Sequence, residues 1–92
     1  MTLSELRNNV AIFNAFNEKR EVSSRLAVTQ LSDYILIYYC TNDCYHAYFS
    51  QDDLCHLLNG LGDVQYLIGV DYLLDAPRLT ISIHKAFFSD LK

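Results

Sequence analysis

Cysteine and histidine side chains gather in the middle of the chain, where they raise the question of a metal site. Five of them fall within seventeen residues: Cys40, Cys44, His46, Cys55 and His56. Tetrahedral zinc needs four converging thiolate or imidazole ligands, and Cys40 and Cys44 have the short spacing of a zinc knuckle. Cys55 and His56, however, are neighbours in a predicted helix and point about 100° apart. We therefore expect the cysteines to be packed, inert thiols, with no metal and no other cofactor.

The same side chains could form a catalytic thiol and imidazole pair, for example Cys55 with His46 or His84. Sequence order neither excludes nor supports such a pair. The chain contains no phosphate-cradling glycine loop, no nucleophile elbow and no paired-acid motif. We expect that the protein is not an enzyme and that it works by binding.

The length and composition predict one domain that spans residues 1–92. The chain is 51% hydrophobic and 20% charged, which excludes the disordered and collagen-like classes. The start lacks a basic leader with an apolar segment, and no apolar run approaches the ~18 residues of a membrane span. A soluble, cytoplasmic protein with reduced thiols is expected.

Apolar periodicity predicts a first helix that ends near Lys19. Thr2 and Glu5 have the spacing of a capping box. The apolar side chains that follow, at helical steps, are Leu3, Leu6, Val10, Phe13 and Phe16. Three segments rich in Val, Ile, Thr and Tyr come next, Arg25 to Leu31, Tyr34 to Thr41 and Cys44 to Ser50. They predict an antiparallel meander of three strands.

A second helix and two more strands complete the predicted fold. Ser50 and Asp53 form another capping box, and Gly60 and Gly62 end the helix after a stripe of leucines: Leu54, Leu57, Leu58 and Leu61. The last strands are Val64 to Leu74, interrupted by Gly69, and Leu79 to His84, with Pro77 in the turn between them. The expected class is α+β, an N-terminal helix packed on a four- to five-stranded, mainly antiparallel sheet with a short second helix. The expected order is α-β-β-β-α-β-β.

The predicted hairpin of Tyr34 to Cys40 with Cys44 to Phe49 has two unlike faces. If residues 41–43 form the loop, the core face holds Ile35, Ile37, Tyr39, Tyr45, Ala47 and Phe49. The other face holds Tyr34, Leu36, Tyr38, His46 and Tyr48. Amphipathic aromatic side chains are enriched at protein interfaces, so Tyr34, Tyr38 and Tyr48 are the predicted anchors for a partner. Two alternatives stay open: the second helix covers this face, or a two-residue loop re-pairs the strands and mixes the faces.

Negative charge is concentrated in the middle of the chain. From Leu26 to Asp75 there is no Lys or Arg, while seven aspartates give this stretch a charge of −7. Nucleic-acid phosphates would repel such a stretch, so we expect a basic protein partner and no binding to free DNA or to membranes. The predicted acidic contacts are Asp52, Asp53, Asp71 and Asp75. The alternative is that these aspartates only solvate turns and helix starts.

In length and overall character the chain resembles the phage-encoded anti-CRISPR proteins, in particular inhibitors of the type I-F CRISPR surveillance complex. The resemblance lies in a short chain with an acidic centre and no catalytic motif, from Thr2-Leu3-Ser4-Glu5-Leu6-Arg7 to His84-Lys85-Ala86-Phe87-Phe88. It implies stoichiometric binding to Cas protein subunits in the host bacterial cytoplasm, which blocks capture of target DNA. The basic residues near the start, Arg7, Lys19, Arg20 and Arg25, would then make a secondary contact with guide-RNA phosphates.

A second hypothesis belongs to a different class. The protein could be a non-catalytic structural or chaperone-like subunit that dimerises through its sheet. A subunit of this kind should bury an exposed apolar patch as a dimer, whereas an inhibitor can be a monomer when alone. The mass in solution distinguishes the two hypotheses.

Overall fold

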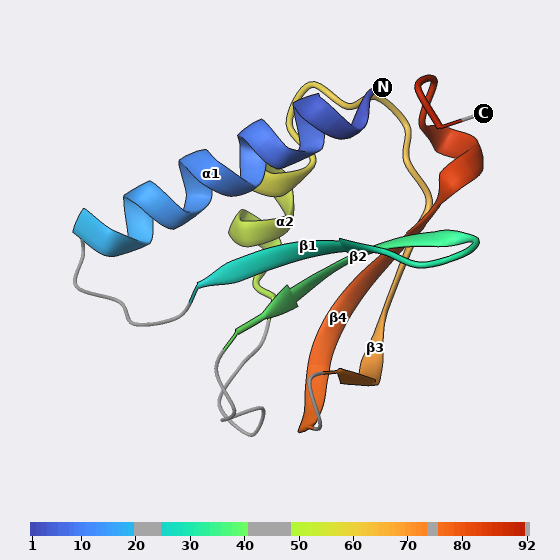
Figure 1. Cartoon of the computed structure of the whole chain (residues 1–92). Helices are drawn as coiled ribbons and strands as arrows, with labels where there is room; N and C mark the ends of the chain where they lie inside the picture. The colour runs from blue at the N-terminus through green and yellow to red at the C-terminus, as the bar shows by residue number, and fades with distance from the viewer. Residues whose placement is uncertain (20–24, 41–48, 74–75, 92) are drawn as a thin grey trace.

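The architecture is two helices on one face of a four-stranded antiparallel sheet, in a computed structural model that describes residues 1–19, 25–40, 49–73 and 76–91 (Figure 1). The elements in chain order are α1 (Leu3–Lys19), β1 (Leu26–Gln30), β2 (Tyr34–Tyr39), α2 (Gln51–Leu57), β3 (Tyr66–Leu73), β4 (Ala76–His84) and the 3-10 turn η1 (Lys85–Phe87). The predicted α+β class and the N-terminal helix over an antiparallel sheet are confirmed. Neither α1 nor α2 has the length and apolar character of a membrane-spanning helix.

Helix α1 buries most of the predicted stripe against the sheet and α2. Leu3, Leu6, Val10 and Phe13 are buried, but Phe16 is exposed and Asn17 is buried in its place. The Thr2 hydroxyl accepts a hydrogen bond from the Glu5 backbone N–H at 3.2 Å, as expected of an N-cap. The other end of the chain strengthens this cap, because the Asp90 carboxylate accepts from the Leu3 backbone N–H at 3.1 and 3.2 Å.

Helix α2 begins as its sequence predicts. The Ser50 hydroxyl accepts from the Asp53 N–H, and an Asp53 carboxylate oxygen accepts from the Ser50 N–H at 3.0 Å. This reciprocal capping box satisfies backbone donors that the first turn leaves without helical partners. After the helix, Gly60 and Gly62 adopt φ values of 77° and 78°, a left-handed conformation that favours glycine.

The sheet order β1-β2-β4-β3 places β2 and β4 at its centre (Figure 1). Strand β2 pairs with β1 on one edge and with β4 on the other, which leaves Tyr34–Tyr38 no edge for a third strand. The predicted hairpin partner falls mostly in residues 41–48, outside the described residues, and Phe49 and Ser50 are not in a strand. The strand at Leu79 to His84 was predicted, but its pairing with β2 was not, because sequence adjacency favours the next segment along the chain as the partner.

Two details of the last hairpin differ from expectation. Gly69 does not interrupt β3, and Pro77 lies inside β4 rather than in the preceding turn. Strand β2 pairs with β4 only from Thr80 onward, so at Pro77 the strand has a described neighbour only on the β3 side. A missing N–H is tolerated where a strand has one partner.

Candidate protein-binding surface

One face of the sheet carries neither of the two helices. The core cluster joins α1 and α2 to Ile35, Ile37, Ile81 and Ile83, which fixes the face on which the helices lie (Figure 1). Side chains alternate along strands, so the residues between these point to the opposite face. The pairing register places the following side chains there, and we call this surface the helix-free face: Tyr34, Leu36 and Tyr38 of β2; Arg78, Thr80, Ser82 and His84 of β4; Leu67, Gly69 and Asp71 of β3.

An open groove lies at one end of the helix-free face. The volume of this groove is about 370 Å³, at the lower end of the range for small-ligand pockets. Tyr34, Leu67 and His84 line it, together with Tyr66 and Phe87. The rings of Tyr34 and His84 meet edge to face with centroids 5.1 Å apart. Because Tyr34 is 39% and Leu67 68% exposed, both can still bury apolar area against a partner.

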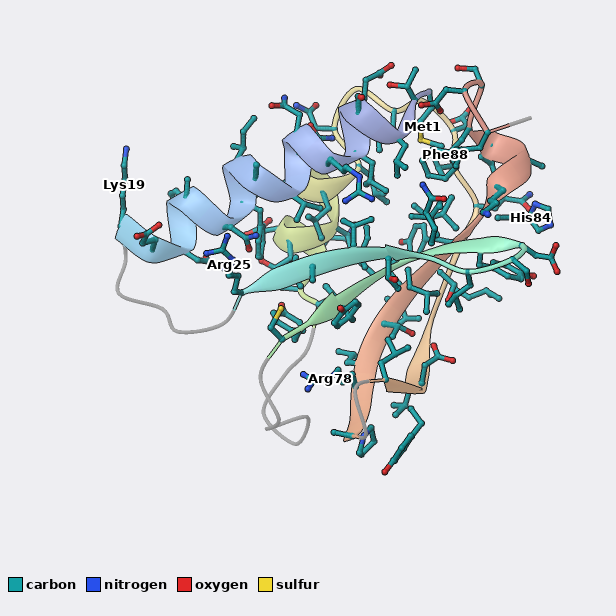
Figure 2. The ribbon with its side chains drawn as sticks, in the orientation of Figure 1. Met1, Lys19, Arg25, Arg78, His84 and Phe88 are labelled. Atoms are coloured by element: carbon teal, nitrogen blue, oxygen red, sulfur yellow. The ribbon has the colours of Figure 1, made fainter. Side chains whose placement is uncertain are left out.

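The His84 ring is held in place by a backbone N–H group two residues further along the chain. Its Nδ1 accepts a hydrogen bond from the Ala86 N–H at 2.9 Å, and His84 thereby caps η1. The ring lies at the end of β4 where the chain turns into η1 (Figure 2). This bond fixes the imidazole orientation against which the Tyr34 ring packs, so the rim of the groove is preorganised.

The centre of the helix-free face is buried rather than exposed. Thr80 is fully buried, and its hydroxyl donates to an Asp71 carboxylate oxygen at 2.6 Å. Arg78 is also buried and donates to the carbonyls of Leu73 and Tyr39 at 3.2 and 3.0 Å. Tyr38, a predicted anchor, is only half-exposed. Of the predicted tyrosines that the structure describes, Tyr34 therefore offers the larger free area.

The predicted acidic contacts divide between two layers of the molecule. Asp71 is exposed on the helix-free face, whereas Asp52 and Asp53 belong to the first turn of α2 on the helix side. Asp52 is exposed, but Asp53 is half-buried and its carboxylate is engaged in the capping box. Asp75 and Tyr48 lie outside the described residues. The alternative reading of aspartates as local capping groups thus holds for Asp53.

The cysteines are placed differently from the prediction. Cys40, directly after β2, and Cys55, on α2, are free and exposed rather than packed in the core. Cys55 is exposed because the buried side of α2 is occupied by Leu54 and Leu57. Cys44 and His46 lie outside the described residues. Within the described part of the chain, no group of three or more His, Cys, Asp or Glu side chains could hold a metal ion.

Two of the basic residues near the start line a second groove, between α1 and β1. Arg7 and Arg25 lie on its rim with Glu18, and its volume is about 340 Å³. Lys19 ends α1, where its charge complements the helix dipole, and Arg20 lies outside the described residues. The predicted secondary contact with phosphates would use Arg7 and Arg25.

Sequence reasoning missed the most exposed apolar segment of the described chain, which is β3. Leu67, Ile68, Val70 and Tyr72 are 68%, 48%, 65% and 72% exposed. Alternating apolar residues normally indicate a buried face. Nothing in the local sequence of β3 shows that α1 does not cover this strand. The strand order, which places β3 at the edge, supplies the missing information.

Comparisons with protein-family models, with curated proteins and with solved structures found no match to this chain.

Proposed function

We propose that the protein is a stoichiometric inhibitor that binds protein subunits of a CRISPR surveillance complex in the bacterial cytoplasm and blocks capture of target DNA. The observation that carries the binding role is the groove of the helix-free face, where Tyr34 and Leu67 are exposed beside a fixed His84 ring. The resemblance stated above supplies the identity of the target.

The charge of the same surface supports a basic partner. Asp71 is the exposed acidic residue of this face, and its cross-strand neighbour Arg78 is buried, with its guanidinium donating to the carbonyls of Leu73 and Tyr39. An aromatic and apolar groove flanked by a carboxylate suits a protein surface that presents an apolar side chain next to Lys or Arg. Asp52 extends the negative charge on the helix side.

The test is a titration of the protein into the purified surveillance complex, followed by an electrophoretic assay of target DNA capture. Inhibition should be complete at about one copy per binding site, because a protein that only occupies a surface does not turn over. Full DNA capture at several-fold molar excess would contradict the proposal. Inhibition at a small fraction of equivalence would indicate an enzyme instead.

Tyr34 gives the sharpest variant for the same assay. Tyr34→Ala should weaken binding by about 2 kcal/mol or more, roughly 30-fold in dissociation constant, if the ring lies at the centre of the interface. Tyr34→Phe keeps the ring and should bind nearly as well. Phe16→Ala is the matched control, since Phe16 is an exposed aromatic residue on α1, away from the sheet face. Equal loss from Phe16→Ala and Tyr34→Ala would place the interface elsewhere.

A further inference from the structure

Strand β3 is an edge strand whose described pairing is to β4 alone. Every residue from Tyr66 to Tyr72 is exposed, and five of these seven are large apolar or aromatic residues. Proteins usually protect a long edge strand with charges, proline, a bulge or a covering element, because its free N–H and C=O groups can pair with another strand. Strand β3 carries one charge, Asp71, and no proline.

We propose that two copies of the chain pair along β3 in antiparallel fashion, with Gly69 of each copy at the two-fold axis. The two four-stranded sheets would then join into one continuous sheet of eight strands. The proposal does not depend on the inhibitor role, because a dimer is compatible with an inhibitor and is required by the alternative role of a subunit that pairs through its sheet. If the dimer forms, the DNA-capture assay and not the mass decides between the two roles.

The sequence of β3 is self-complementary in this register. With Gly69 opposite Gly69, Ile68 lies opposite Val70 of the second copy and Tyr66 lies opposite Tyr72. These four side chains are on the face that the helices cover elsewhere, so each apolar residue meets an apolar residue. A shift by one residue would place them on the same side as Leu67 and Asp71 of the second copy and mix the faces.

Charge is compatible with the same register. Asp71 is the only charged residue of β3, and it lies opposite Leu67 of the second copy rather than opposite its own equivalent. Like charges directly across a strand pair destabilise it, and this arrangement avoids them. A pairing centred on Val70 or on Tyr72 would bring the two Asp71 carboxylates closer together.

The exposed area agrees with what a dimer needs. The exposed fractions of Tyr66, Leu67, Ile68, Val70 and Tyr72 together equal about three fully exposed residues. At about 200 Å² for each residue, this sets an upper limit of roughly 600 Å² per copy and 1,200 Å² for the pair, because the faces of the paired strands stay in solvent. That value lies at the lower end of specific interfaces, so a reversible dimer is expected.

The experiment is sedimentation of the protein from about 1 µM to 500 µM, a range that spans weak and tight reversible dimers. The mass should rise from the 10.6 kDa monomer toward twice that value. A chain that stays monomeric throughout would overturn the proposal. A dimer that forms as described, together with failure of the DNA-capture assay, would remove the proposed function and leave this inference standing.

A matched pair of lysine substitutions tests the edge and the register. Val70→Lys places a charge on the apolar side opposite Ile68 and should raise the dimer dissociation constant at least tenfold. Leu67→Lys places the same charge on the helix-free face opposite Asp71 of the second copy, so the dimer should be retained or tightened. A dimer that survives Val70→Lys, or that both variants lose equally, contradicts the pairing.

A cross-link tests the two-fold axis directly. A Cβ added at Gly69 would have no atom within 4 Å, so Gly69→Cys should fold normally. In a background with Cys40, Cys44 and Cys55 changed to Ser, the Gly69→Cys chain should form a disulfide dimer on mild oxidation, because directly opposed strand residues have Cα separations that a disulfide can span. Ile68→Cys in the same background is the control and should cross-link far less. Equal yields from both would contradict the register.

Discussion

The two edges of the sheet differ in how the rest of the chain covers them. At the β1 edge, Leu26 is buried, and both its backbone N–H and its C=O are bonded to the Asn14 side chain of α1 at 2.9 Å. At the β3 edge, no described helix lies over the strand, and Tyr66–Tyr72 are all exposed. Three isoleucines that lie side by side across β2, β4 and β3 show the change in coverage. Ile37 and Ile81 are fully buried, while Ile68 is 48% exposed.

The difference shows that the helices complete only one half of the fold. At the β1 edge the strand is bonded to α1, whereas strand β3 and the groove end of the helix-free face present apolar area to the surroundings. Contiguous exposed apolar area in a small protein marks an interaction surface more often than a packing fault. We therefore propose that the half which intramolecular packing leaves open is the half that meets a partner.

The isoleucine row offers the largest contrast in stability. Ile81→Ala should lower the free energy of unfolding by about 2–5 kcal/mol, because it opens a cavity at a fully buried position. Ile68→Ala, in the same row, should cost well under half of that in dilute protein. Urea denaturation of both variants at low concentration measures the difference. Equal losses would mean that β3 is covered in the isolated monomer.

The closed edge can be opened by one substitution. Asn14→Ala removes both hydrogen bonds to Leu26 and leaves two backbone groups without their side-chain partner, at an expected cost of about 2 kcal/mol. Asn8→Ala, on the exposed side of the same helix, should change stability little. Thermal unfolding followed by circular dichroism compares the two variants. An unchanged melting temperature for Asn14→Ala would show that the stability of the fold does not depend on these two hydrogen bonds.

The helices and strands can be predicted from the sequence, but the difference between the two sheet edges cannot. Local chemistry predicts α1 and α2, since Thr2 and Ser50 act on donors three residues away. It also predicts the apolar side of β2. Strand pairing joins segments far apart in the chain, such as Tyr34 with His84, and no local pattern encodes it. The exposure of β3 depends on that pairing, and for this reason the sequence did not predict an exposed strand.

The same limit applies to the candidate surface. Tyr34 could be predicted as an anchor from its position in the alternation of β2, but its partner ring His84 comes from the far end of the fold. Asp52 and Asp53 are adjacent in sequence and look alike there. The structure shows that the Asp53 carboxylate caps α2, whereas Asp52 is exposed.

The different roles of Asp52 and Asp53 predict a change in stability of intermediate size. Ser50→Ala should destabilise the fold by about 1 kcal/mol through loss of the α2 cap, whereas Asp52→Ala should leave stability within about 0.5 kcal/mol. For charge, Asp52→Lys is therefore a cleaner probe than any change at Asp53. Denaturant midpoints of the two variants test the assignment. A larger loss from Asp52→Ala than from Ser50→Ala would reverse it.

The smallest effect is expected from a chelator. Cys40 and Cys55 are exposed and contribute little to the core, so the melting temperature of the purified protein should not change when metal is removed. Calorimetry with and without chelator makes the comparison. A large fall in melting temperature would reveal a structural metal.

We expect that the target is met by the half of the molecule that contains β3 and the groove, and not by the half that contains α1 and β1. Hydrogen–deuterium exchange of the dilute protein, alone and with the purified surveillance complex, tests it most directly. Protection on binding is expected in peptides that cover Tyr34–Tyr39 and Tyr66–His84, with α1 and β1 little changed. Protection confined to Leu3–Lys19 and Leu26–Gln30 would contradict it.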